Sequence, residues 1–409
     1  MITWGRHVGE TVGMAAERSI RHGRLRRRSG RRSAAIAVAA GLAVLGVSAT
    51  SLVAIAAASI SRNVTGNAVD LGVEADGTGG LRLGAIEGGF SVLIVGTDND
   101  TAQGEQFGVR DSTLNDVNIL LHVSADHSNA TVISFPRDLI LGRPECTDPE
   151  TGVVSPAETA ASLNRAFGAG GLACVNDTLQ AFTGLSVPYA GWVSFNGVIE
   201  MSNAVGGVPI CLAGPIRDTD SGLDLPAGVS TVSGETALAF LRTRKGVGDG
   251  SDLGRISSQQ QYLASLMRTV RSADTLSNPP VLYGLAQAAS SNLHLSTTMT
   301  NPSTMISLAL ALKDIDLERM VFVQYPALDD PDFPGKVVPD PVLGAELMAR
   351  VLADEPVVLA PAQGEPVEPA PPAVEPTAGA QEPAPPQEPP AVAAPGQTAA
   401  EETCAVPSG

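Results

Sequence analysis

The sequence predicts an α/β or α+β domain of roughly 260 residues, with a membrane anchor before it and an extended tail after it. Three observations predict this organisation. Apolar strand-like runs alternate with segments of helical spacing between residues 89 and 354, a long uncharged run precedes them, and a Pro-rich segment without cations follows them. The net charge of −17 excludes a generally basic nucleic-acid binder, so no nucleic-acid partner is expected.

The N-terminal residues 1–33 are basic, with nine Arg against two acidic residues, and residues 33–61 then carry no charge at all. A helix needs ~20 apolar residues to cross a bilayer, so we expect a transmembrane helix over residues 34–60. The Arg excess before it predicts a cytoplasmic N-terminus and an extracytoplasmic domain. The alternative is a cleaved signal peptide, whose apolar core would span only ~7–15 residues.

Two segments flank the expected domain. Residues 61–88 are rich in Gly and poor in apolar residues, which indicates a spacer off the membrane. Residues 356–409 contain 14 Pro, seven Glu and no Lys or Arg. Such a composition buries too little apolar surface to offset chain entropy, so we expect residues 355–409 to form a disordered tail.

Inside the domain, residues 89–354, short apolar runs predict strands and 3.6-residue spacing predicts helices. The first strands are expected at 90–96, 117–123 and 130–135, with a hairpin through the turn-forming residues 124–129. The other expected strands are 187–195, 208–212 and 320–325. The expected helices are 157–167, 171–182, 196–204, 235–241, 256–272, 280–292, 302–312 and 341–353.

The cysteines agree with an extracytoplasmic domain. No pair of them has the spacing of a zinc site. We expect a disulfide between Cys146 and Cys174, because Cys146 lies in a Pro-rich loop that a cross-link would restrain. Cys211 lies in an apolar strand pattern and is interpreted as a core residue. The alternative is that all thiols are free and buried.

Arginines are the residues of the domain most suited to chemistry, because Lys occurs there only at 245, 313 and 336. Arg137 directly follows a strand, and Arg242 and Arg244 stand two apart at a helix end. Arg255 precedes the next helix. Guanidinium groups bind phosphate oxygens in bidentate geometry, so arginines from three loops could hold a pyrophosphate. The alternative is a set of surface salt bridges.

Two acidic residues complement these arginines. Asp98 follows one buried strand and Asp116 opens the next. If the strands are neighbours, both carboxylates reach one rim, where they would suit Mg²⁺ beside a phosphate. Turn capping is the alternative. The motifs of serine hydrolases, zinc proteases and P-loop proteins are all absent.

Eight ordered stretches carry a family resemblance: LIVGTD at 93–98, NDVNILLHVSAD at 115–126, VISFPRD at 132–138, LNRAFGAGG at 163–171, AVGGVPICL at 204–212, GLDLPAG at 222–228, SGETALAFLRTR at 233–244 and GDGSDLGRISSQQQ at 248–261. On these, the chain resembles the LytR-CpsA-Psr family of bacterial cell-envelope enzymes in its actinobacterial form. The resemblance implies an α/β/α sandwich with a central mixed sheet and a hydrophobic cavity for a polyprenyl chain.

The resemblance also implies a reaction, namely transfer of a glycopolymer from a polyprenyl-pyrophosphate carrier onto peptidoglycan through a phosphodiester bond. The enzyme would be a Mg²⁺-dependent phosphotransferase, with Mn²⁺ as a substitute, at the cytoplasmic membrane. Two rival functions are a metal-dependent pyrophosphatase that uses water as acceptor and a non-catalytic lipid-glycan binder.

The family's site residues carry over by motif. The implied catalytic residues are Arg137, Arg242, Arg244 and Asp116, the substrate-binding residues are Arg255, Asp138, Asn164 and Gln260, and the metal-associated acids are Asp98 and Asp116. The chain departs from the family at Leu114-Asn115 and at Ser258, where the family often has arginine, so one cation is missing from the edge of the expected site.

Overall fold

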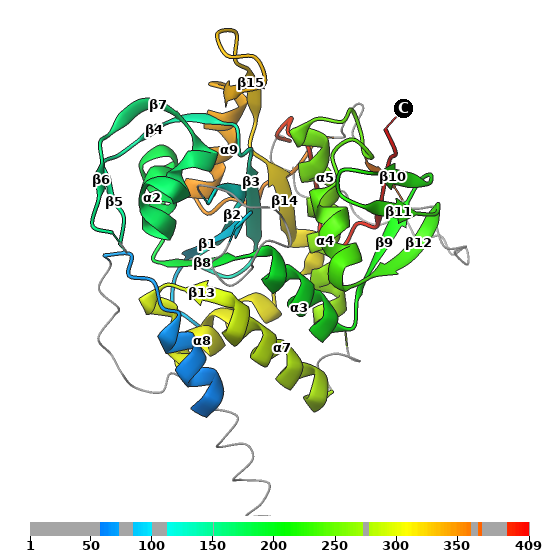
Figure 1. Cartoon of the computed structure of the whole chain (residues 1–409), viewed down its shortest axis with the longest axis horizontal. Coiled ribbons are helices and arrows are strands. Elements are labelled where there is room, and N and C mark those ends of the chain that lie inside the picture. The colour runs from blue at the N-terminus through cyan, green and yellow to red at the C-terminus, as the bar shows by residue number, and fades with distance from the viewer. Residues whose placement is uncertain are drawn as a thin grey trace, which may run out of the picture. The chain divides into compact units, whose positions relative to one another are not determined.

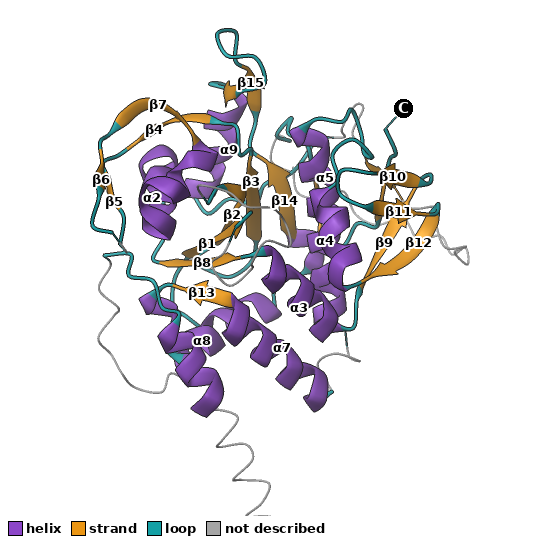
Figure 2. Ribbon diagram, viewed as in Figure 1, coloured by secondary structure: helices purple, strands orange, loops and turns teal. Residues whose placement is uncertain are grey.

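The structure is a computed structural model that describes residues 58–72, 85–99, 113–149, 151–272, 278–360, 367–369 and 391–408. The predicted α/β domain with a central mixed sheet is confirmed (Figure 1, Figure 2). In spatial order the strands of the sheet are β13 (Leu293–Leu295), β8 (Tyr189–Val193), β1 (Phe90–Thr97), β2 (Asn115–Val123), β3 (Ala130–Phe135), β14 (Met320–Gln324) and β18 (Gly396–Thr398). The pairs β1–β8 and β3–β14 are parallel, and the other neighbours are antiparallel.

Helices cover both faces of this sheet, because apolar residues alternate along the central strands and fill two cores. Leu93 of β1 and Leu120 of β2 pack with helices α2 (Ala166–Thr183) and α9 (Leu343–Leu352). Val92 and Val132 face the opposite way and pack with α5 (Asp252–Arg271) and α8 (Pro302–Lys313). A strand alternates its side chains in this way when both faces of its sheet are covered.

A second sheet adjoins α5 and contains β12 (Gly228–Val232), β9 (Val208–Leu212), β19 (Thr403–Ala405) and β17 (Val367–Pro369). The remaining helices are α3 (Phe195–Val205), α4 (Gly234–Arg242), α7 (Pro279–Asn292) and the 3₁₀ turns η1 (Leu163–Arg165), η2 (Thr297–Met299) and η3 (Leu317–Arg319). The remaining strands form four antiparallel two-stranded pairs. These are β4 (Ile140–Arg143) with β7 (Glu158–Ser162), β5 (Cys146–Thr147) with β6 (Val154–Ser155), β10 (Ile216–Asp218) with β11 (Leu223–Leu225), and β15 (Ala327–Asp329) with β16 (Val337–Pro339).

The helix expected over residues 157–167 is wrong. Residues Glu158–Ser162 form strand β7, which pairs with β4, and Leu163–Arg165 form the 3₁₀ turn η1. The local Ala-rich sequence favours a helix, but pairing with β4 and the Arg143–Glu158 ion pair override that preference.

The predicted disulfide between Cys146 and Cys174 is present and ties the β5 loop to α2. Gly170 and Gly171 interrupt the helical backbone of α2 at this point. A Cβ on Gly170 would lie 2.8 Å from the Cβ of Cys146, so the cross-link packs directly against this glycine.

The expected transmembrane helix, residues 34–60, lies outside the described residues except for residues 58–60, which are helical. Within the described part of the chain, no helix combines the length and the apolar character that crossing a bilayer requires. The expected spacer packs onto the domain where it is described, which corrects that expectation. Val64 and Leu71 are buried, and Val69 donates its N–H to Leu295 and pairs with Ser296.

The expectation of a disordered tail is also wrong for residues 391–408. Strand β18 closes one edge of the central sheet, and β19 pairs in parallel with β9. Cys404 forms a disulfide with Cys211, so Cys211 is not simply a core residue. Figure 1 shows this C-terminal segment beside α5. A short apolar stretch with one cysteine is enough to order it, because the cross-link and the strand pairing offset its chain entropy.

Candidate functional site

The site lies at one end of the central sheet, where β1 ends, β2 begins and β3 ends. Because β2 runs antiparallel to both neighbours, Asp98, Asp116 and Arg137 come to the same edge. The pairing of β1 with β2 shifts between Gly96 and Thr97, and Asp116 is the extra residue of the resulting bulge. A bulge re-aims the side chain it carries, so the fold gives Asp116 an orientation that regular pairing would not.

We call the charged group at this edge the arginine cluster, and its members are Arg137, Arg244, Arg255, Lys336, Asp116, Asp138 and Asp252. Arg137 is the member attached to the central sheet. Its Nη1 lies 2.6 Å from Asp116 Oδ1, and its Nε lies 3.3 Å from Asp138 Oδ2. Burial alone would lower the pKa of Arg137, but the surrounding carboxylates, Asp116 first, raise it above its usual value.

Asp252 is the centre of the cluster, because its Oδ1 contacts three guanidinium groups. It lies 2.7 Å from Arg255 Nη2, 3.4 Å from Arg244 Nη2 and 3.7 Å from Arg137 Nε. None of these three contacts is a hydrogen bond, and the buried Nε of Arg255 has no hydrogen-bond partner. The cluster therefore retains donor capacity that an anionic ligand could use.

Arg255 is the most deeply buried cation of the cluster. Burial lowers its pKa to about 10, and the nearby guanidinium groups of Arg244 and Arg137 contribute to the shift. It is still a cation at neutral pH. Its Nη2 also donates to the backbone oxygen of Asp116 at 2.9 Å, which joins the start of α5 to the start of β2.

Local structure fixes the two helices that supply these groups. Ser251 caps α5 by accepting the N–H groups of Leu253 and Gly254, which places Asp252 and Arg255 on the first turn. Asp218 fixes the chain after α4. Its Oδ2 accepts from Thr243 Oγ1 at 2.7 Å and from the N–H of Arg244 at 3.1 Å. Burial opposes the ionised form, but these hydrogen bonds prevail, so the pKa of Asp218 is lowered.

Lys336 is a member of the cluster that sequence reasoning missed. It precedes β16, and its Nζ lies 2.6 Å from Asp138 Oδ1 and 3.3 Å from Ser162 Oγ. The departures at Leu114 and Ser258 predicted a shortage of cations at the site's edge, and Lys336 supplies one from a distant part of the chain. The only signal in the sequence was the scarcity of lysine in the domain.

The predicted catalytic residue Arg242 and the predicted substrate-binding residue Asn164 have different surroundings. Arg242 ends α4, and its guanidinium lies 4.5 Å from the centre of the Phe195 ring, whereas Arg244, two residues on, contacts Asp252. The backbone N–H of Asn164 donates to the oxygen of Arg137 at 2.8 Å, which keeps Asn164 beside the cluster. Its buried Oδ1 has no hydrogen-bond partner.

Gln260 is fully buried in α5, and its backbone oxygen accepts from Gln397 of β18. Its neighbour Gln259 is four residues from Arg255 and donates to the oxygen of Leu241 at 2.9 Å. Residues four apart share a helix face, so Gln259 is the glutamine that the spacing from Arg255 places toward α4.

Asp98 and Asp116 are the candidate metal ligands. Asp98 is buried, and its Oδ1 accepts the N–H of Leu114 at 2.9 Å. Within the described residues, no group of three or more metal-binding side chains occurs. Two carboxylates still fit Mg²⁺, which takes one or two from a protein and its other ligands from phosphate and water.

A Ser–His–Asp arrangement lies at the opposite end of the sheet. Ser91 Oγ is 3.0 Å from His122 Nδ1, and His122 Nε2 is 2.9 Å from Asp354 Oδ1. Ser91 is 1% exposed. A nucleophile must reach its substrate, so this set is a structural link between the sheet and the end of α9.

Comparisons with known proteins agree with the fold. The sequence profile of the LytR_cpsA_psr family matches residues 53–335. The chain is 30% identical over 253 residues to the cell wall biosynthesis protein LcpA of Corynebacterium glutamicum, a match that covers 53% of this chain and 48% of that protein. It is 24% identical over 242 residues to the polyisoprenyl-teichoic acid–peptidoglycan teichoic acid transferase TagT of Bacillus subtilis, with 58% of this chain and 69% of that protein covered.

The match thus spans about half the length of LcpA. Among solved structures, protein gbs0355 of Streptococcus agalactiae shares the fold, with a TM-score of 0.52 and 20% identity over 65% of this chain and 88% of that one. The family profile covers most of the chain. It includes every member of the arginine cluster except Lys336, which follows the last matched residue. The chain belongs to the LytR_cpsA_psr family.

Proposed function

We propose that this protein is a membrane-anchored phosphotransferase that moves a glycopolymer from a polyprenyl-pyrophosphate carrier onto peptidoglycan in cell-wall assembly. The observation that carries the proposal is the convergence of Arg137, Arg244 and Arg255 on Asp252, with buried donor capacity left over. A pyrophosphate is the ligand that such a set of guanidinium groups matches in charge and in fork geometry. The name of the relative TagT supports a teichoic-acid-like polymer as the transferred group.

In the proposed reaction, a hydroxyl oxygen of the acceptor attacks the phosphorus that bears the glycan. A new P–O bond forms, the P–O bond of the pyrophosphate bridge breaks, and polyprenyl phosphate leaves. The arginines stabilise the charge that develops on the phosphoryl oxygens and on the leaving group.

The hydroxyl proton goes to a carboxylate of the cluster. Asp138 has both oxygens engaged, by Arg137 and by Lys336. Only Oδ1 of Asp116 is paired with Arg137. The second carboxylate oxygen of Asp116 is therefore a better proton acceptor than either oxygen of Asp138. We therefore assign the role of general base to Asp116.

Asp98 would hold Mg²⁺ together with phosphate oxygens and water, and the metal would supply Lewis-acid stabilisation of the pyrophosphate charge. Asp116, the other expected metal-associated acid, acts as the base in this proposal. The buried side chain of Asp98 is held in place by the N–H of Leu114.

The position in the cell and the lipid site belong to the same proposal. Residues 34–60 would anchor the chain with the domain outside the cytoplasm, and two disulfides are typical of an oxidising compartment. The polyprenyl chain would lie on the sheet face covered by α5 and α8, where the apolar surfaces of both helices gather.

The test uses the full-length protein in detergent with a radiolabelled polyprenyl-pyrophosphate-linked glycan, with and without purified peptidoglycan. We expect label on peptidoglycan through an acid-labile phosphodiester and one polyprenyl phosphate released per transfer. Release of polyprenyl phosphate without acceptor would identify a pyrophosphatase instead. Binding of the carrier without any release would identify a non-catalytic lipid-glycan binder.

A further inference from the structure

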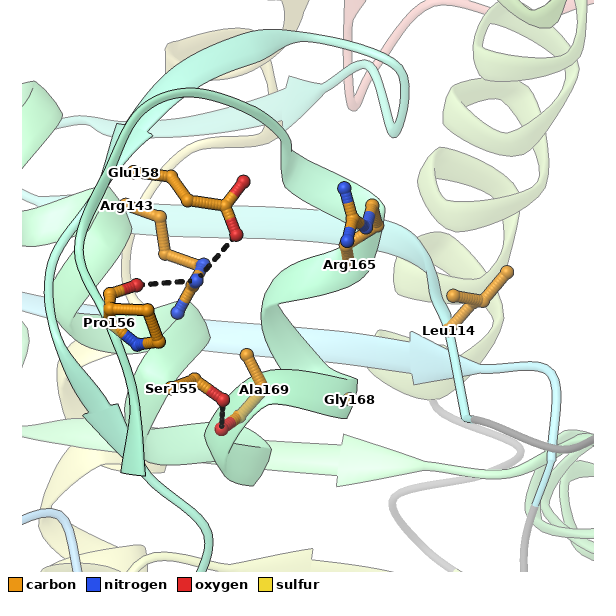
Figure 3. A pocket seen from close by; sticks show the side chains of 8 residues that line it. All are labelled: Leu114, Arg143, Ser155, Pro156, Glu158, Arg165, Gly168 and Ala169. Carbon is orange, nitrogen blue, oxygen red and sulfur yellow. Dashed lines mark hydrogen bonds and ion pairs between the residues drawn. The ribbon is translucent and has the colours of Figure 1, made fainter. Parts of the chain in front are cut away.

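A polar pocket lies on the α2 side of the sheet, next to the segments that carry the arginine cluster. It has a volume of about 320 Å³ and is lined by Leu114, Arg143, Ser155, Pro156, Glu158, Arg165, Gly168 and Ala169 (Figure 3). We call it the Arg165 pocket. None of its lining residues belongs to the arginine cluster, and sequence reasoning assigned no role to Arg143 or Arg165.

Three backbone segments join the pocket to the site. Leu114 lines the pocket and donates its N–H to Asp98. Asn164, which precedes Arg165, donates its N–H to the oxygen of Arg137. The buried side chain of Asn115 holds both sides together, because it donates to Leu163 O at 3.0 Å and accepts from the N–H of Phe167 at 3.1 Å. A ligand in the pocket would therefore sit beside Asp98 and Asp116.

The two arginines of the pocket differ in what they contact. Arg143 is almost fully buried, and its Nη2 donates to Pro156 O and to Glu158 at 2.8 Å each. Arg165 is exposed and makes no hydrogen bond or ion pair with the residues that the structure describes. Figure 3 shows Arg143 and Glu158 at one side of the pocket and Arg165 at the other. The two guanidinium groups and the one carboxylate leave the pocket with one net positive charge, and Arg165 also acts electrostatically on Glu158, whose pKa is lowered first by the hydrogen bond from Arg143.

We propose that the Arg165 pocket binds the peptidoglycan acceptor through a carboxylate of its muramyl peptide, an inference that rests on the proposed transfer reaction. A single guanidinium fork matches a single carboxylate. The volume is at the lower end of the range for ligand sites, ~300–1,000 Å³, which suits one sugar or a short peptide end. Pyrophosphate needs several convergent cations, and those lie in the arginine cluster.

The geometry of phosphoryl transfer also favours the acceptor over the donor. The attacking and leaving oxygens lie roughly in line on opposite sides of the phosphorus. With the lipid on the face covered by α5 and α8, the leaving polyprenyl phosphate departs on that side. The acceptor then enters from the α2 side, which is where the Arg165 pocket lies.

The test compares two probes on the full-length protein in detergent. One is a disaccharide muropeptide with free stem carboxylates, and the other is chitobiose, which has no carboxylate. Titration calorimetry should give tighter binding of the muropeptide to the wild type. Arg165→Ala should abolish that preference, with a loss of about 10-fold in affinity and a similar rise in the KM for peptidoglycan. Arg165→Lys should retain part of it, because the charge remains without the fork.

The matched control is Arg217→Ala, because Arg217 is an exposed arginine of the β10–β11 pair whose ion pair is with Asp224. Its affinities and KM values should equal those of the wild type. The inference is wrong if Arg165→Ala binds both probes as the wild type does, or if its KM rises for the polyprenyl-linked donor and not for peptidoglycan. The proposed function fails separately, if the wild type transfers no glycan while its muropeptide preference still depends on Arg165.

Discussion

The arginine cluster and the β10–β11 pair contain the same kinds of ion pair in opposite settings. In the cluster, three arginines share the carboxylate of Asp252, whose side chain is 16% exposed. On the β10–β11 pair, Arg217 and Asp224 contact one another at 3.0 Å, but their side chains are 79% and 70% exposed. An exposed pair contributes little to stability because water screens it. Burial and convergence, rather than the number of arginines, therefore mark the candidate site.

The largest effect is expected when the carboxylate of Asp252 is removed. Asp252→Ala should lower the free energy of unfolding by ~3–5 kcal/mol, because it leaves the buried Arg255 beside two other cations without its carboxylate. Chemical denaturation of the full-length protein in detergent measures this. Asp224→Ala is the control from the exposed pair, and a loss for Asp252→Ala no larger than for Asp224→Ala would contradict the account.

The second prediction concerns rate. Arg137→Ala should reduce glycan transfer by ~10²–10³-fold, because it removes a preorganised donor aimed at developing charge. Arg217→Ala should leave the rate unchanged and alter stability by no more than about 0.5 kcal/mol. Equal rates for both variants would show that the cluster is a structural ion-pair network.

A third prediction concerns Lys336, the member of the arginine cluster that follows the last residue matched by the family profile. Lys336→Ala should lower the transfer rate about 10-fold, as expected for the loss of one charge-assisted contact. Lys313→Ala is matched to it, because Lys313 is an exposed lysine whose ion pair is with its neighbour Asp314. Lys336→Arg should recover most of the transfer rate. Equal transfer rates for Lys336→Ala and Lys313→Ala would show that Lys336 is not part of the site.

The smallest effect, a change in the pH dependence of folding stability, is expected for substitution of Asp218, which positions Arg244. The pKa of Asp218 is lowered in the folded protein. Its charge therefore stabilises the fold at pH values above its pKa in the unfolded chain, ~4, and this stabilisation is lost as the pH falls through its lower pKa in the folded protein. Asp218→Asn should therefore be less stable than the wild type at pH 7, and the two stabilities should converge below about pH 4. Urea titrations at several pH values measure this, and a constant difference across the range would contradict it.

The sequence predicted the parts of the fold and site that depend on local pattern. The apolar runs at β1, β2 and β3 and the turn between the last two are local features, as is the position of Arg137 after β3. The helix expected at 256–272 begins earlier, at Asp252, so Arg255 lies on its first turn and not before it. The disulfide between Cys146 and Cys174 closes a short sequence separation of 28 residues.

What the sequence did not reveal depends on contacts between distant segments. Lys336 reaches Asp138 across 198 positions, and Cys404 reaches Cys211 across 193. Strand β7 has a helical pattern and becomes a strand only by pairing with β4. The central position of Asp252 could not be predicted from the sequence either. Its carboxylate contacts three arginines only because three separate segments of the chain meet in the fold.

Binding of the pyrophosphate by the arginine cluster is tested by measuring glycan transfer by Arg244→Lys and by Arg244→Ala. Arg244 contacts Asp252 at 3.4 Å, and its side chain is 33% exposed, so a ligand can reach it without unfolding the cluster. Lysine keeps the charge and removes the bidentate fork. The account predicts that both variants fold normally and lose transfer, with Arg244→Lys between Arg244→Ala and the wild type. Wild-type transfer rates for both would contradict it, because Arg244 would then not bind the pyrophosphate.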